Sequence, residues 1–208
     1  MLLLPAFHKR KKNAASIGRL VAGYGEIEFL LAWCVGMALA CQTPIDARMS
    51  KGEHRAHYEH EGIAQLYIRR GESARIDFAK QAMRPVITRY NLDDVFHDAV
   101  MLVQLCLKIR NLFSHCNWDQ SSKRGLFFVS LEDSAKQHPP LHLRTRHAGT
   151  KSLDIAEGYF TLAISLLNFI SQAMAVRGQV AIGPEFATPK RVKGLKSEID
   201  LFPYKPAR

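Results

Sequence analysis

Apolar side chains recur at helical spacing through three long stretches of this chain, and this pattern limits the fold more than any other feature. The stretches run from Ser16 to Gln42, from Asp93 to His115 and from Ser152 to Val176. Within each, apolar residues follow one another three or four positions apart, as they do on the buried face of an amphipathic helix. Three such helices predict an all-α fold, an up-and-down helical bundle.

Several residues have the types expected at helix ends and helix crossings. Ser16 and Asp93 are candidate N-caps, and Gly178 is placed to stop the last helix. In the first stretch, small side chains recur every four residues at Ala32, Gly36 and Ala40. Such a row lets a second backbone approach closely, so we expect either another helix of the bundle or a partner subunit to pack there.

The remaining segments are expected to be short helices, loops and tails. Residues 43–60 are polar and rich in histidine, two short helical pieces follow at 62–68 and 73–83, and Pro85 is expected to mark the next break. Residues 125–131 and 141–145 are expected to pair as a small β-ribbon inserted into the bundle. The resulting organisation is a basic N-terminal tail (1–15), a helical domain (16–178) and an extended basic C-terminal tail (179–208).

The balance of charge is strongly basic. The chain has 208 residues, with 29 Lys and Arg against 19 Asp and Glu, which gives a net charge of +10. Such a charge predicts attraction to polyanions, with nucleic acid the first partner to consider and an anionic membrane surface the second. Much of it lies near the two ends, where basic residues are often only solvated.

Cysteine spacing and apolar run length indicate where the protein works. The four cysteines show no C-x-x-C spacing and lie in or beside apolar runs, as reduced cytosolic thiols do. The longest uncharged apolar run, from Phe29 to Cys41, is well short of the roughly 20 residues that cross a bilayer. We therefore expect a cytoplasmic protein with no membrane partner.

The segment L-K-I-R-N-L-F-S-H-C-N-W, residues 107–118, places Arg110, Asn111 and His115 at the polar end of an otherwise apolar helix. A guanidinium can bind two phosphoryl oxygens at once, and an imidazole can move a proton at neutral pH. RNA supplies its own nucleophile, the 2′-hydroxyl, so its cleavage needs neither a metal nor a cofactor. Asn111 could bond Arg110 or His115 and orient it. These residues point to metal-free RNA cleavage.

Helix geometry limits how Arg110 and His115 can act together. Five residues along an α-helix turn two side chains about 140° apart, whereas Asn111 and His115, four apart, share a face. Either the helix unwinds near His115, which residues 116–118 make plausible, or the site is assembled from two subunits about a two-fold axis. A purely structural role is the alternative, because cations at a helix C-terminus offset the helix dipole.

These residues resemble a known family. Arg110, the polar Asn111 and His115 match the R-[N/D/H]-x-x-x-H motif of the HEPN superfamily, the higher eukaryotes and prokaryotes nucleotide-binding domains. The segment G-Y-G-E-I-E-F-L-L, residues 23–31, is similar to the first helix of bacterial HEPN-like proteins, and the resemblance covers about residues 17–176. HEPN domains are helical bundles that typically dimerise. Many are metal-independent endoribonucleases of toxin–antitoxin, abortive-infection or other defence systems.

The resemblance implies roles for individual residues. Arg110 and His115 would be catalytic and Asn111 supporting, and Glu26 or Glu28 would be an ionic partner of the motif arginine. Ser114 and Trp118 lie beside the motif, where Trp118 could stack a base but is better placed to cover the helix end. Apart from the resemblance, the charge pattern indicates a basic set that either contacts RNA or is only solvated: Lys9, Arg10, Lys11, Lys12, Arg144 and Arg146. The implied partners are RNA, a second copy of the chain and an antitoxin or other defence-system protein.

Two other interpretations stay open at this stage. A non-catalytic helical module could bind RNA or a protein partner through the same surface. The cluster of Glu53, His54, His57, His60 and Glu61 could hold a metal ion, but a spacing of three drifts about 60° per step around a helix, so one tight site would need an irregular backbone. We therefore expect no metal there and interpret the cluster as an exposed polar loop.

Overall fold

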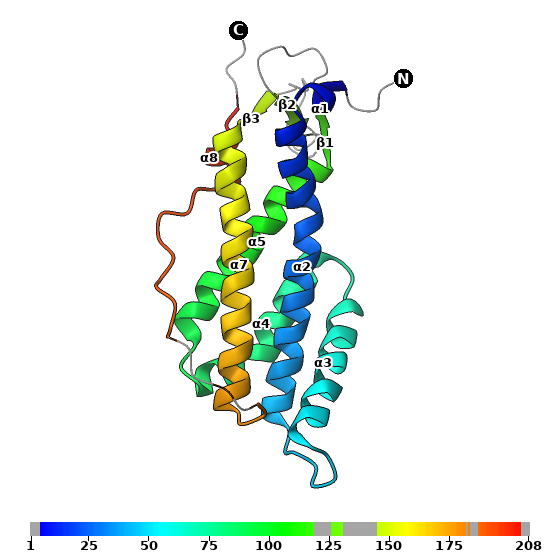
Figure 1. The fold of residues 1–208 in the computed structure, drawn as a ribbon, viewed down its shortest axis with the longest axis vertical. Helices are drawn as coiled ribbons and strands as arrows, with labels where there is room; N and C mark the ends of the chain where they lie inside the picture. The colour runs from blue at the N-terminus through cyan, green and yellow to red at the C-terminus, as the bar shows by residue number, and fades with distance from the viewer. Residues whose placement is uncertain (1–4, 119–125, 131–144, 182, 184–186, 205–208) are drawn as a thin grey trace. The chain divides into compact units, whose positions relative to one another are not determined.

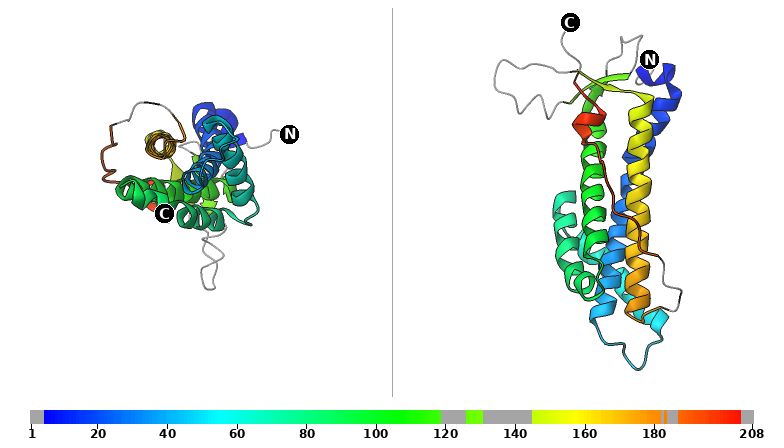
Figure 2. Two further views of the ribbon diagram at one scale, coloured as in Figure 1. Left: turned by 90° about the horizontal axis from the view of Figure 1, so that it is seen from below. Right: turned by 90° about the vertical axis from the view of Figure 1, so that its left-hand side faces the viewer.

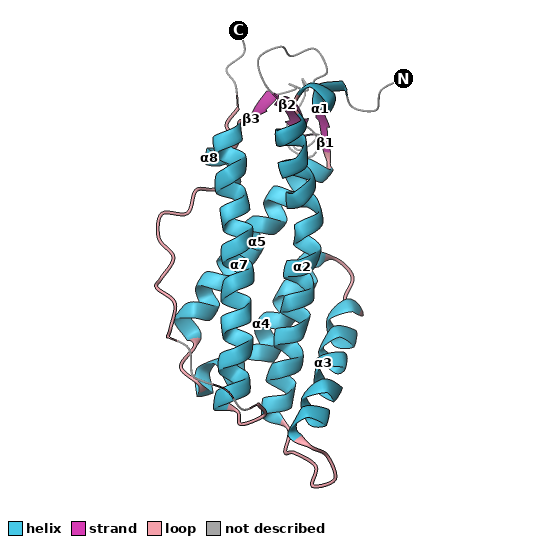
Figure 3. Ribbon diagram, in the orientation of Figure 1, coloured by secondary structure: helices cyan, strands magenta, loops and turns pink. Residues whose placement is uncertain are grey.

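The computed structural model describes residues 5–118, 126–130, 145–181, 183 and 187–204. Within these ranges the chain is mostly helical, with one small antiparallel sheet (Figures 1 and 3). The all-α class with a small β insertion is thus confirmed, and its HEPN-like form remains a prediction. The elements are α1 (Pro5–Lys9), α2 (Lys11–Gln42), α3 (Lys51–Tyr67), α4 (Glu72–Arg89), α5 (Asp93–Ser114), β1 (Cys116–Trp118), β2 (Leu126–Ser130), β3 (Thr145–Ala148), α7 (Thr150–Arg177) and α8 (Glu198–Leu201).

The chain divides into two compact units, and the three long helices α2, α5 and α7 each contribute to both. The first unit comprises residues 1–24, 105–160 and 194–208. The second comprises residues 25–104 and 161–193. The three stretches with helical periodicity correspond to α2, α5 and α7, so these three predictions are confirmed in position and type.

An aromatic cluster forms the core of the first unit beside the sheet. Phe113, near the end of α5, packs against Trp118 of β1, with ring centroids 5.8 Å apart, and against Phe202, at 5.0 Å. Phe128 of β2 lies 5.1 Å from Trp118, and both Phe128 and Phe202 are fully buried. Because these rings are large and apolar, the cluster holds the C-terminal end of α5 against the sheet.

The sheet has the order β1-β2-β3, with both pairings antiparallel. Strand β2 confirms the first half of the expected ribbon. Its partner is β3, which begins at Thr145, and residues 141–144 of the predicted second strand lie outside the described residues. Strand β1 was not predicted, because three residues are too few to show an alternating pattern.

In the second unit, α2 and α3 cross at very short range through two glycines (Figure 1). A Cβ atom on Gly36 would lie 2.7 Å from the Cα of Glu59, and one on Gly62 would lie 2.6 Å from the carbonyl oxygen of Ala32. Real Cβ contacts are essentially never this short. The small-residue row is therefore a helix-packing surface within the chain, the first of the two expected alternatives.

The N-terminal half contains more helix than predicted. Helix α2 begins at Lys11 rather than after Ser16, so part of the expected N-terminal tail is helical. The histidine-rich segment expected to be a loop lies largely in α3, because Ser50 and Glu53 form a reciprocal capping box that starts the helix. Pro85 does not end a helix: it lies inside α4, where its side chain is exposed.

The described part of the C-terminal segment is only partly extended. Residues 187–197 have no regular structure, as predicted, but Ser197 and Asp200 form a second capping box that starts α8. Leu201 and Phe202 are then buried. The prediction of an extended tail is therefore wrong at residues 198–202, because two apolar side chains stabilise this segment by entering the core of the first unit.

Two helices, α2 and α7, are long and apolar enough to cross a membrane when judged by length and composition alone. In each, 56% of the most apolar window is buried within the structure. Core helices of soluble proteins pass the same test, as does a signal sequence near the N-terminus, where α2 lies. The expected absence of a membrane partner and the cytoplasmic location therefore remain predictions.

Candidate functional site

The predicted site lies at the C-terminal end of α5, in the first unit. Arg110 and Asn111 are on the last turns of the helix and are half-buried, whereas His115 is exposed in the turn that follows Ser114. The aromatic cluster fixes this end of the helix, because Phe113 belongs both to α5 and to the cluster. The site residues are therefore attached to a well-packed part of the unit.

Arg110 and Asn111 are brought together directly. Nη1 of Arg110 donates a hydrogen bond of 2.7 Å to Oδ1 of Asn111. This bond to a neutral amide oxygen orients the guanidinium. Of the two orienting roles expected for Asn111, the structure shows the one toward Arg110.

His115 retains helical spacing relative to Asn111, because its amide donates a bond of 3.0 Å to the Asn111 carbonyl. The helix therefore does not unwind between Arg110 and His115, and the first of the two ways in which these side chains could converge is not observed. The ideal angle of about 140° still applies to them. The second way, a site assembled from two copies of the chain, remains a prediction.

The expected supporting residues have separate environments. Ser114 is exposed, and Trp118 is 8% exposed, with its ring 4.9 Å from that of Phe7. Trp118 therefore covers the helix end, as favoured above, rather than offering a face to a base. In the second unit, Glu28 pairs at 2.8 Å with Arg75, and Glu26 is exposed. The ion pair of Glu28 is thus formed with a residue other than the motif arginine.

The expected RNA contacts are accessible only in part. Lys9, Lys11 and Lys12 are exposed and Arg10 is half-buried. Arg146 lacks the exposure expected of an RNA contact, because it is only 2% exposed. Its guanidinium lies 4.3 Å from the ring centroid of Tyr204, and its Nη2 donates a hydrogen bond to the Tyr204 hydroxyl. A guanidinium enclosed in this way is not available to RNA. Arg144 lies outside the described residues.

The histidine cluster is not an exposed loop. His54 is buried in α3, and its Nε2 lies 3.0 Å from the carbonyl oxygen of Ala40, whereas His57 and His60 are exposed. Glu53 is occupied in the capping box. Among the residues that the structure describes, no three His, Cys, Asp or Glu side chains are grouped so that they could hold a metal ion.

The cysteines are free thiols, and Cys116 is next to the candidate histidine. Burial raises the pKa of Cys34 to about 12, that of Cys41 to about 11 and that of Cys116 to about 12. Burial also raises the pKa of Cys106. A thiol with such a pKa is protonated at neutral pH and is a poor nucleophile, so a cysteine–histidine mechanism at Cys116 is disfavoured.

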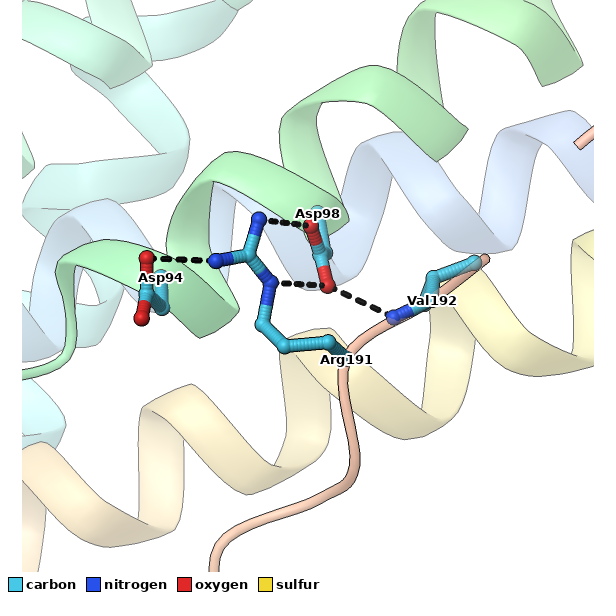
Figure 4. Close-up of polar contacts among 4 residues, drawn as sticks. All are labelled: Asp94, Asp98, Arg191 and Val192. Carbon is cyan, nitrogen blue, oxygen red and sulfur yellow. Dashed lines mark hydrogen bonds and ion pairs between the residues drawn. The ribbon is translucent and has the colours of Figure 1, made fainter. Parts of the chain in front are cut away.

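A charged clasp in the second unit, which was not among the expectations, fastens the C-terminal segment to α5 (Figure 4). The path of this segment can be followed in Figure 2. Asp98 is 2% exposed and accepts hydrogen bonds from Arg191 Nε at 3.0 Å, Arg191 Nη2 at 3.1 Å and the Val192 amide at 2.8 Å. Arg191 Nη1 also donates to Asp94 at 2.6 Å. In the sequence, the indication of this clasp was Asp98 itself, a carboxylate that lies between Val95 and Ala99 of the buried face.

Opposing effects act on the pKa of Asp98. Burial alone would raise it, but the Val192 amide and the Arg191 guanidinium together hold it below the ordinary value of 3.8. A carboxyl group with a lowered folded pKa stabilises the fold at pH values above its unfolded pKa. That contribution is lost as the pH falls below about 3.8 and through the lowered pKa.

Replacing Arg191 by glutamine is expected to raise the pKa of Asp98, because the carboxyl group stays buried after the guanidinium is lost. The stability that the ionised Asp98 adds above its unfolded pKa should then be reduced, so the part of the acid-induced loss that comes from Asp98 should be smaller than in the wild type. The Val192 amide should also exchange with solvent faster. NMR titration of the Asp98 carboxyl carbon and amide exchange measure both effects. Lys193→Gln removes the same charge from an exposed neighbour and should change neither, and equal effects of the two variants would contradict the clasp.

Comparison with known proteins found no matching family model, no matching curated protein and no matching solved structure. The interpretation of the site therefore depends on its own residues.

Proposed function

We propose that the protein is a metal-independent endoribonuclease whose active site is shared by two copies of the chain. One observation carries the proposal: an oriented Arg110 and an exposed His115 occupy the same end of α5. The guanidinium of Arg110 can bind phosphoryl oxygens, and the imidazole of His115 can move a proton. RNA cleavage through the 2′-hydroxyl requires these two functions and no metal.

The proposed reaction is an internal transesterification. The imidazole of His115 removes the proton of the 2′-hydroxyl, and the 2′-oxygen attacks the adjacent phosphorus. The bond from phosphorus to the 5′-oxygen breaks, and a protonated His115 of the partner subunit donates a proton to that oxygen. The products are a 2′,3′-cyclic phosphate and a 5′-hydroxyl. Arg110 binds the non-bridging oxygens and stabilises the charge that develops on them.

The geometry of α5 supports a site that is shared by two subunits. Because Arg110 and His115 are directed about 140° apart on a continuous helix, one copy of the chain supplies only half of the site. A two-fold axis beside this helix end would bring two arginines and two histidines into one cleft. The exposed Lys9, Lys11 and Lys12 belong to the same unit as the site, and their charge favours a polyanionic substrate.

The resemblance to HEPN domains extends this proposal to a biological role. It suggests a cytoplasmic RNase of a toxin–antitoxin or phage-defence system, held inactive by an antitoxin or a similar partner. The competing proposal is a non-catalytic module that binds RNA or a protein through the same helix end. The dipole of α5 alone would account for a cationic pair there.

The test is incubation of purified protein with single-stranded RNA in excess EDTA. We expect cleavage products that end in a 2′,3′-cyclic phosphate, and no cleavage when every 2′-hydroxyl is replaced by hydrogen. A matched DNA oligonucleotide is the control for binding without reaction. Retarded migration of RNA without any cleavage would favour the non-catalytic module, and cleavage of the DNA would exclude the 2′-hydroxyl mechanism.

A further inference from the structure

A pocket of about 460 Å³ lies between α4 and α5, wholly within the second unit. Its wall carries three basic side chains, Lys80 and Arg84 from α4 and His97 from α5, and an apolar set, Ile87, Phe96 and Val100. Volumes between about 300 and 1,000 Å³ are typical of sites for small molecules. The pocket has no part in the RNA cleavage proposed above.

Helical spacing accounts for the two kinds of wall. Lys80 and Arg84 are four residues apart and therefore lie on one face of α4. Phe96 and Val100 have the same spacing on α5 and are half-buried, whereas Ile87 is 1% exposed. The pocket thus combines an apolar surface with cationic groups that reach solvent, and one ligand with two chemically different ends would match both.

The two carboxylates of the pocket, Asp77 and Asp93, equal its two permanent cations in number, but each has a partner other than Arg84. Asp77 lies 3.6 Å from Lys80 in an exposed pair, and Asp93 accepts a hydrogen bond from the Thr88 hydroxyl at 3.0 Å. Within the described part of the chain, Arg84 has no hydrogen bond or ion pair, and neither does the His97 side chain. A guanidinium without a carboxylate partner, next to an apolar wall, is available to an anion.

Pro85 leaves one backbone acceptor of α4 without its helical partner. Proline has no amide hydrogen, so the carbonyl oxygen of Gln81, four residues earlier, lacks its helical donor. Gln81 itself lines the pocket.

We propose that this pocket binds a small phosphomonoester with an apolar body. The phosphate would accept hydrogen bonds from Arg84, Lys80 and His97, and the apolar part would lie against Phe96 and Val100. A phosphate is favoured over a carboxylate because its three terminal oxygens can serve three donors on two helices, whereas a carboxylate has only two.

Calorimetric titration of the full chain with phenyl phosphate, inorganic phosphate and benzoate tests this proposal. We expect phenyl phosphate to bind about tenfold more tightly than inorganic phosphate, because of the apolar wall, and more tightly than benzoate. Arg84→Gln should weaken phenyl phosphate binding by about tenfold or more, and Lys80→Gln should weaken it less. Arg70→Gln, which removes the same charge from an exposed residue outside the pocket, should leave binding unchanged.

Each other outcome overturns part or all of the proposal. Equal effects of Arg84→Gln and Arg70→Gln would mean that the anion responds only to net charge. Benzoate binding as tightly as phenyl phosphate would exclude phosphate as the recognised group, and absence of phenyl phosphate binding would remove the site. Since His115→Ala leaves the pocket intact, binding must persist in that variant, and the result is independent of whether RNA is cleaved.

Discussion

Replacing His115 by alanine is expected to lower the rate of RNA cleavage by about 10²- to 10⁴-fold, the usual range for loss of a general acid–base group. The loss should be at the upper end, because in a shared site the substitution removes both the base and the acid. The exposed side chain contributes little packing, so the midpoint of urea unfolding should change by little. Initial rates on a fluorescent RNA, measured beside unfolding curves, separate the two effects.

The matched control is His60→Ala. His60 is also exposed, but it lies on α3 in the second unit, away from the candidate site residues in sequence and outside their unit. Its loss should leave the rate unchanged. Cleavage that persists in His115→Ala at the wild-type rate would show that the activity belongs to another group or to a contaminant.

Replacing Gly62 by valine is expected to destabilise the second unit by about 3 kcal/mol or more, the upper part of the range for overpacking. Even the first added carbon would lie 2.6 Å from the Ala32 carbonyl oxygen and against the backbone of Gly36. Both neighbours are main chain, so the strain can be relieved only if α2 and α3 separate. The free energy of unfolding from urea titration measures the loss.

Gly25→Ala is the control on α2. No atom lies within 4 Å of a Cβ built at Gly25, apart from the residue's own local backbone. Alanine there should raise the free energy of unfolding by up to about 1 kcal/mol, because it is the better helix former. Similar behaviour of Gly62→Val and Gly25→Ala would contradict the close helix crossing.

The long helices could be predicted because burial of one face imposes a period on the sequence. The same argument failed where a helix is mostly solvated. Helix α3 carries many exposed polar residues and has a low overall hydrophobicity, although the Ser50 and Glu53 capping box indicates its start. Pro85 was expected to end a helix, but the structure places it inside α4 on the exposed side, where water can hydrogen-bond the carbonyl that it leaves without a donor.

The candidate site was predictable only as far as it is local. Arg110, Asn111 and His115 lie within one turn and a half of helix, so their relative directions follow from spacing. Contacts between segments that are far apart in the sequence produce no such spacing pattern. Arg191 reaches Asp98 across 93 positions, and Arg146 is covered by Tyr204 from 58 positions away. The burial of Arg146, which removes it from the expected RNA contacts, therefore required the fold.

Mixing two inactive variants tests the shared site most directly. Arg110→Ala and His115→Ala should each be inactive alone, but a heterodimer of the two contains one intact pair, the arginine from one chain and the histidine from the other. After unfolding and refolding of an equal mixture, random pairing makes half of the dimers mixed. Each mixed dimer keeps one arginine and one of the two histidines, so cleavage should return in part, to less than a quarter of the wild-type rate. No recovery, in a mixture that sedimentation shows to be dimeric, would contradict a site built from two chains.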